Sequence, residues 1–120
     1  MSLKQTRLTI TTATDGSATV IGDTIQGRLI EVAYGKGTFE AGVDVTISIT
    51  GSIYAQTLLT LTDANNDAVY YPRVQACDNT GTAINGAYTD VAVIGQIKIE
   101  VADGGSKKAG TVDIVWDDCR

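Results

Sequence analysis

The chain lacks residue types on which much protein chemistry depends. Histidine is absent from its 120 residues, which removes the commonest general acid–base and the commonest metal ligand together. Without a histidine base, no serine can act in a Ser-His-Asp mechanism. The composition therefore predicts a protein that is not an enzyme, with no catalytic residues, no metal site and no cofactor.

Cysteines are scarce, and long apolar runs are missing. Cys77 and Cys119 are the two thiols, and their spacing fits neither a zinc site nor a C-x-x-C redox pair. We interpret them as buried or half-exposed thiols, because a disulfide between them would need an oxidising compartment. No apolar stretch approaches the roughly 18 residues of a membrane span, and no signal peptide is recognisable. We expect synthesis in a reducing cytoplasm and no membrane partner.

Basic residues are too few and too scattered for a nucleic-acid groove. The chain has nine Lys and Arg against 14 Asp and Glu, a formal net charge of −5. Lys107 and Lys108 form the only adjacent basic pair, whereas nucleic-acid binding needs a basic stripe. This balance argues against a nucleic-acid partner. It indicates solubility or, alternatively, a basic protein partner.

The alternation of apolar and polar residues is the strongest positive signal. Val43–Thr50 alternates without a single error, which predicts a strand that buries its valines and isoleucines and exposes its Asp, Thr and Ser residues. Val, Ile and Thr make up a third of the chain, and no window shows a helical apolar stripe. We predict one all-β domain over residues 1–120, an antiparallel sandwich or flattened barrel of about eight or nine short strands. The expected strands are Gln5–Thr12, Ala18–Ile21, Arg28–Tyr34, Val43–Thr50, Ile53–Thr62, Ala68–Ala76, Asp90–Ile94, Gln96–Ala102 and Gly110–Asp117.

Turn residues suggest how these strands are joined. Asp15-Gly16 is a strong hairpin signal between the first two strands. The glycine-rich stretch Asp103–Ala109 predicts a flexible hairpin tip that joins the last two strands, with Trp116 in the core. The single proline, Pro72, predicts an edge strand or a bulge. Gly35–Gly42 and Asp78–Ala87 are expected to be loops.

Three constellations suggest chemistry, but each has a simpler explanation. Asp63-x-Asn65-x-Asp67 matches the start of a calcium loop but lacks its later glycine and glutamate, so we interpret it as an Asx-based turn. Gly104–Lys108 lacks the spacing and the helix of a phosphate-binding loop. Asp117 and Asp118 are neighbours on a strand and point to opposite faces, so we interpret them as a solvated acidic end.

Aromatic residues outside the expected core are the candidates for a contact surface. Tyrosine and arginine are enriched at protein interfaces, and the segment Tyr70–Arg73 combines them beside the proline. The predicted protein-interface residues are Tyr54, Tyr70, Tyr71, Arg73 and Tyr88. A sugar-stacking platform is the alternative use of exposed aromatic rings.

Three groups of segments, taken in order, carry a likeness to a known class of proteins. They are Leu8–Thr19, then Gly27–Tyr34 with Gly42–Ile47, and finally Tyr71–Arg73 with Ile97–Val112. Together they span nearly the whole chain. The chain resembles the small all-β structural proteins of tailed bacteriophage virions, which are encoded among head and head–tail genes.

The resemblance implies a virion structural protein with no catalytic residues. Its first hypothesis is a capsid decoration (cement) protein that binds the head shell in many copies, and its alternative is a neck, head–tail connector-associated or tail protein. The implied partners are the major capsid protein or other virion proteins, and further copies in a homo-oligomer. The implied location is the virion, after synthesis in the bacterial cytoplasm. A carbohydrate- or receptor-binding β module is the competing hypothesis from another class.

Overall fold

The computed structural model describes residues 3–50 and 56–118 and contains eight strands. All of their pairings are antiparallel, and they form one sheet that does not close into a barrel. This confirms the all-β class and favours the sandwich over the flattened barrel. The strands are β1 (Leu3–Thr11), β2 (Ala18–Gly35), β3 (Asp44–Thr50), β4 (Gln56–Leu61), β5 (Ala68–Tyr70), β6 (Arg73–Cys77), β7 (Ala83–Ala102) and β8 (Ala109–Asp117).

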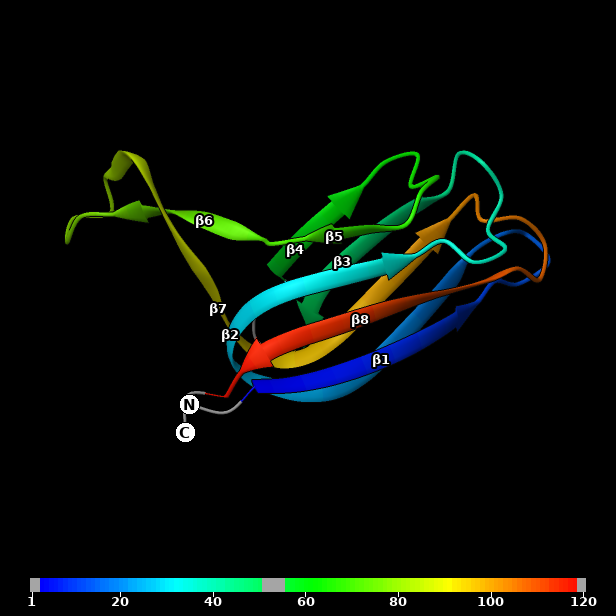
Figure 1. Cartoon of the computed structure of the whole chain (residues 1–120), viewed down its shortest axis with the longest axis horizontal. Coiled ribbons are helices and arrows are strands. Elements are labelled where there is room, and N and C mark those ends of the chain that lie inside the picture. Colours follow the sequence, from blue (N-terminus) through cyan, green and yellow to red (C-terminus); the bar gives the residue numbers. More distant parts are fainter. Residues whose placement is uncertain (1–2, 51–55, 119–120) are drawn as a thin grey trace.

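One long strand joins the two layers of the fold. The order in the sheet is β1-β8-β2-β7-β3-β4, with β5 also paired to β2 and β6 to β7. The first part of β2 pairs with β7 and its last part with β8, and Arg28 and Leu29 pair with both. At these residues β2 curves from one layer to the other, as Figure 1 shows. The fold is therefore a doubled-over sheet with the core between its layers.

The core is aliphatic and draws on both layers. It includes Ile10 of β1, Leu29 of β2, Ile47 of β3, Ile99 of β7 and Ile114 of β8, all essentially inaccessible to solvent. Burying such a side chain contributes roughly 1.5–3 kcal/mol relative to leaving it exposed. These large aliphatic residues give the sandwich, which we call the body, a conventional hydrophobic core.

The alternation in β3 is confirmed on one face and wrong at one residue of the other. Val43, just before β3, is buried together with Val45, Ile47 and Ile49, as predicted. Ser48, expected to be exposed, is also buried. It lies opposite Lys98 of β7 and next to β4, with an irregularity in the β3–β4 register beside it. β3 is flanked by β7 on one edge and by β4 on the other, and the alternation alone does not reveal these neighbours.

Two strands are far longer than the sequence pattern predicts. β2 unites the expected strands Ala18–Ile21 and Arg28–Tyr34, and β7 unites Asp90–Ile94 with Gln96–Ala102 and part of the expected loop. Gly27 shows why the pattern was broken there. It has a φ of +146°, and a Cβ atom on it would overlap the Asp117 carbonyl oxygen. Glycine is needed inside this strand because another strand's backbone approaches so closely.

Both predicted hairpins are wrong. β1 pairs with β8 rather than with β2, and β7 pairs with β2 and β3 rather than with β8. The Asp15-Gly16 turn and the Asp103–Ala109 segment instead connect the two layers. Turn residues signal a reversal of the chain but not the partner of the next strand.

These two connections bind each other at one end of the sandwich. Thr12 is buried, and its hydroxyl donates to the Gly105 carbonyl at 2.6 Å and accepts from the Lys108 amide at 2.9 Å. The Gly104 amide donates to the Gly16 carbonyl at 2.9 Å. The expected hairpin tip is therefore held in place by hydrogen bonds to its neighbour.

The connection Gly35–Gly42, which was expected to be a loop, packs against the body. Phe39 is among the largest fully buried side chains. The Lys36 amide donates to Asp67 Oδ1, and the Gly42 amide donates to Asn65 Oδ1. Asn65 and Asp67 thus act as acceptors for backbone groups, the role expected of an Asx-rich turn. Tyr34 donates to the nearby Ala64 carbonyl at 2.9 Å, and its burial raises its pKa to about 12.

Candidate interaction surfaces

A two-stranded arm extends away from the sandwich. It consists of β6, the loop that follows it and residues 83–90 of β7, and we refer to residues 73–90 as the arm. β6 pairs with β7 alone among the described strands. The arm occupies the left-hand side of Figure 1 and lengthens the molecule to 48 Å against 30 and 26 Å across. No residue of the arm is classed as buried.

Pro72 separates the arm from the body. The expected strand Ala68–Ala76 is two strands, β5 paired with β2 and β6 paired with β7, and Pro72 lies between them. Proline has no amide hydrogen to donate to a ladder, so a change of partner strand at this residue leaves no ladder donor unpaired. The sequence predicted one strand over Ala68–Ala76 that lies at an edge or bulges at Pro72. The single strand is wrong, because the sequence does not specify the pairing partners on either side of the proline.

The structure places three of the five predicted interface residues on or beside the arm. Tyr71 and Tyr88 are 59% and 65% exposed. Arg73 is exposed and forms an ion pair with Asp90 at 3.1 Å. Tyr70 differs from the expectation because it is half-buried and packs against the core. Tyr54 lies outside the described residues.

Register assigns the arm's side chains to two faces. Arg73 lies opposite Asp90, and Gln75 lies opposite Tyr88. Residues two apart on a strand share a face, so these four side chains form one face of the arm. Val74 and its partner Thr89 form the other. Tyr88 therefore stands beside a charged pair, the combination of aromatic ring and arginine typical of contact surfaces.

The tip of the arm is ordered by its own side chains. Asp78 Oδ1 accepts hydrogen bonds from the Thr80 hydroxyl at 2.7 Å, the Thr80 amide at 2.9 Å and the Thr82 amide at 3.0 Å. These bonds, above all the one from the Thr80 hydroxyl, lower the pKa of Asp78. Cys77 beside it is a free thiol and is exposed, so the expectation of a buried or half-exposed thiol is wrong there because the residue lies in the arm. Cys119 lies outside the described residues. Residues 78–82 thus form a turn held by hydrogen bonds to the Asp78 side chain.

Sequence reasoning missed the aliphatic residues of the arm. Val74 and Ile84 are both more than two-fifths exposed. Val74 was expected in a strand and Ile84 in a loop, and the departure of β6 and β7 from the sandwich leaves both side chains exposed. The available signal was the long polar stretch between and around these residues. Such a stretch has too few apolar residues to form a second layer over the two side chains.

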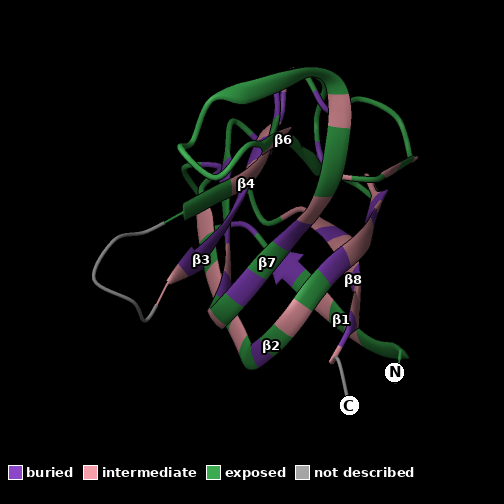
Figure 2. Cartoon of the chain, turned by 90° about the vertical axis from the view of Figure 1, so that its left-hand side faces the viewer, coloured by how far each residue is buried: buried purple, intermediate pink, exposed green. Residues whose placement is uncertain are grey.

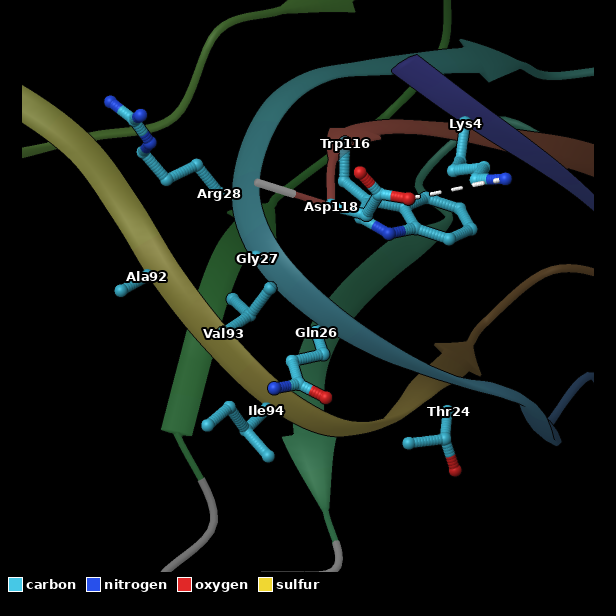
Figure 3. A pocket seen from close by; sticks show the side chains of 10 residues that line it. All are labelled: Lys4, Thr24, Gln26, Gly27, Arg28, Ala92, Val93, Ile94, Trp116 and Asp118. Atoms are coloured by element: carbon cyan, nitrogen blue, oxygen red, sulfur yellow. Dashed lines mark ion pairs between the residues drawn. The ribbon is translucent and has the colours of Figure 1, made fainter. Parts of the chain in front are cut away.

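A second feature is an open groove of about 940 Å³ beside the curve of β2. Its walls come from β2 and β7 on one side and from the ends of β1 and β8 on the other (Figure 3). Trp116 lines it. The prediction that Trp116 belongs to the core is half right, because the side chain packs against the core but is only partly buried.

The acidic end of β8 also differs from the expectation. Asp117 is buried rather than solvated, at the point where β8 meets the curve of β2. Asp118 lies in the wall of the groove, 3.9 Å from the Lys4 ammonium. Further along β8, Asp113 accepts two hydrogen bonds from the Arg7 guanidinium, at 2.8 and 2.9 Å. Hydrogen bonding from Arg7 lowers the pKa of Asp113.

Within residues 3–50 and 56–118, no three Cys, Asp or Glu side chains gather in a group that could hold a metal ion. Over the same residues, no helix has the length and apolar character to cross a membrane.

Comparison with known proteins gives no family. No protein-family model and no curated protein match the sequence. A solved structure described as "Bacillus endospore appendages form a novel family of disulfide-linked pili" matches 96% of this chain and 88% of its own, with a TM-score of 0.45 and 13% identity. Values this low establish neither a common family nor a common role.

Proposed function

We propose that this protein is a bacteriophage virion structural protein that decorates the head shell in many copies. The resemblance of Leu8–Thr19, Gly27–Tyr34 and Ile97–Val112 to small virion proteins motivates the proposal. The arm is the single structural observation that supports it. An exposed ribbon with aromatic and aliphatic side chains on a rigid sandwich suits binding to protein surfaces.

The physical chemistry of a two-stranded ribbon favours contact between the arm and a partner protein. A two-stranded ribbon is only marginally stable in water by itself, and its outer edges carry backbone groups that another strand can pair with. Contact with a partner would remove water-exposed apolar surface, which is favourable. The side chains concerned are Tyr71, Val74, Ile84 and Tyr88. Weak contacts of this kind add up when copies linked in a homo-oligomer bind neighbouring sites of a symmetric shell.

The proposed partner is the major capsid protein or another virion protein, and a position at the neck or tail is the alternative. The copy number of this protein in purified particles distinguishes the two positions. Decoration predicts a copy number close to that of the major capsid protein, whereas a neck or tail position predicts a much smaller one. Binding should survive nuclease treatment, because it is to protein. Absence from purified virions, or turnover of a substrate by the isolated protein, would contradict the proposal.

A matched pair of variants tests the arm itself. Ile84→Ala changes the arm, and Ile21→Ala makes the same change at a similarly exposed isoleucine of β2. We expect Ile84→Ala, and more strongly Tyr88→Ala, to lower occupancy on particles that lack the wild-type protein. Ile21→Ala should bind as the wild type does. Equal occupancy for all three variants would rule out the arm as the docking surface.

A further inference from the structure

The groove beside β2 has a composition that the virion proposal does not use. Thr24 and Gln26 lie two residues apart on β2, and both are exposed. Ile94 of β7 lies opposite Gln26 and is 68% exposed. This side of the groove therefore offers a hydroxyl and an amide, both of which donate and accept hydrogen bonds, next to an aliphatic surface.

The other side of the groove combines an aromatic ring with a charged pair. Lys4 of β1 lies opposite Trp116 of β8 in the register, and Asp118 follows two residues later. Side chains so placed share a face, and Figure 3 shows the Lys4–Asp118 ion pair beside the indole. No described residue accepts a hydrogen bond from the Trp116 indole N–H. The indole therefore offers the groove both an aromatic surface and a donor.

We infer that this groove binds a neutral hexopyranose unit of a glycan. A pyranose ring has an apolar C–H face and a rim of hydroxyl groups that both donate and accept. The indole of Trp116 matches that face, and Gln26, Thr24 and the Lys4–Asp118 pair match the rim. This site is independent of the arm and of the proposed place in a virion.

Charge and shape disfavour other occupants. Asp118 offsets Lys4 at 3.9 Å, and Arg28 is the one other charged residue among the described residues of the lining. The described lining therefore lacks the basic stripe that a polyanion such as nucleic acid needs, and the chain as a whole carries a net charge of −5. An apolar peptide would cover the hydroxyl of Thr24 and the amide of Gln26 and leave them without partners, which is costly. A polyhydroxylated ring meets both kinds of surface.

The single tryptophan makes the test specific to this groove. Trp116 is the only one in the chain, so its fluorescence reports on the site directly. We propose to titrate the full chain with maltotetraose, cellotetraose and chitotetraose at millimolar concentrations, and to screen it on an array of bacterial glycans. At least one saccharide should give a saturable change in emission, and the same sugar class should give signal on the array.

Variants then locate the binding. Gln26→Ala and Thr24→Ala should each weaken binding about fivefold, the loss expected for one hydrogen bond, and Trp116→Phe should abolish the array signal. Gln56→Ala, at an exposed glutamine of β4, is the matched control and should bind as the wild type does. Melting curves check that each variant is folded.

Three results would overturn the inference. One is the absence of any saturable response to the three saccharides and on the array. Another is equal binding by Gln26→Ala and Gln56→Ala, which would place the sugar elsewhere. The third is a change in emission on raising the protein concentration alone, which would make a second copy of this chain the occupant. None of these results bears on virion occupancy, which tests the proposed function separately.

Discussion

The two halves of β7 belong to different regions of the molecule and differ in their neighbours and in their burial. Residues 91–102 run through the sandwich, flanked by β2 and β3, and buried residues recur along them. Residues 83–90 pair with β6 alone among the described strands, and none of them is buried. Figure 2 shows this change of burial along one continuous strand.

The contrast shows that pairing alone does not give stability. Both halves of β7 form ladder hydrogen bonds, but such bonds replace bonds to water and contribute modestly in net terms. The body adds burial of aliphatic side chains, roughly 25 cal/mol for each Å² removed from water. The arm adds almost no burial of aliphatic side chains. It is available for contacts with a partner for the same reason that it contributes little to folding.

Hydrogen exchange along β7 gives the largest expected difference between the two regions. The amides of Ile97 and Ile99 should exchange only through global unfolding, with protection of about 10³-fold or more for a typical domain stability. The amides of Tyr88 and Thr89 should exchange through local opening of the arm, with far weaker protection. Exchange measured by NMR decides this. Uniform protection along β7 would mean that the arm folds with the body as one unit.

Truncating one isoleucine in each region measures the same difference as free energy. Ile47→Ala in β3 removes a side chain with no exposed surface and should lower the free energy of unfolding by about 2–5 kcal/mol. Ile84→Ala in the arm should change it by less than about 0.5 kcal/mol. Urea denaturation followed by circular dichroism gives both values. Similar losses would refute the division into body and arm.

A pair of glycines separates close packing from backbone strain. Gly27→Ala in the body meets the Asp117 carbonyl oxygen as well as a positive φ. It should cost more than the roughly 1–3 kcal/mol of strain alone. Gly42→Ala, in the connection before β3, also meets a positive φ, +91°, but its nearest neighbouring atom lies 4.0 Å away, so strain should be its whole cost. If the two variants melt at the same temperature, crowding at Gly27 is unimportant.

The sequence predicted what depends on nearest neighbours and failed on what depends on distant ones. Burial of Val45, Ile47 and Ile49 follows from alternation, which is a local property. The partners of β7 and β8 do not, because the residues of a turn are the same whether the chain returns beside itself or crosses to the other layer. Burial of Ser48 depends on strands that cover β3 from both sides.

The candidate surfaces were only partly predictable for the same reason. The exposure of Tyr71, Arg73 and Tyr88 could be predicted from residue type and from Pro72, whereas Trp116 was predicted to lie in the core. The groove itself could not be predicted, because it combines β1, β2, β7 and β8. These strands meet only once the sheet has doubled over at Arg28 and Leu29.

The smallest expected effect concerns the charged pair of the body. Asp113 has a lowered pKa because of Arg7, so the folded state holds its proton less tightly than the unfolded state does. Its contribution is fully present above the unfolded pKa of about 3.9 and is lost as the pH falls through the lowered folded value. Arg7 is largely exposed, so solvent screening limits the gain to about 1 kcal/mol or less.

Asp113→Asn should therefore lower the free energy of unfolding at pH 7 by no more than that amount. The difference from the wild type should shrink as the pH falls below about 4, because the wild-type carboxylate is then protonated as well. Asp90→Asn, which removes the ion pair of the arm, is the control. It should leave the global free energy unchanged at every pH, because the arm opens before the body unfolds. Denaturation curves at a series of pH values test both variants, and a loss on Asp113→Asn that is independent of pH would assign the effect to packing rather than to charge.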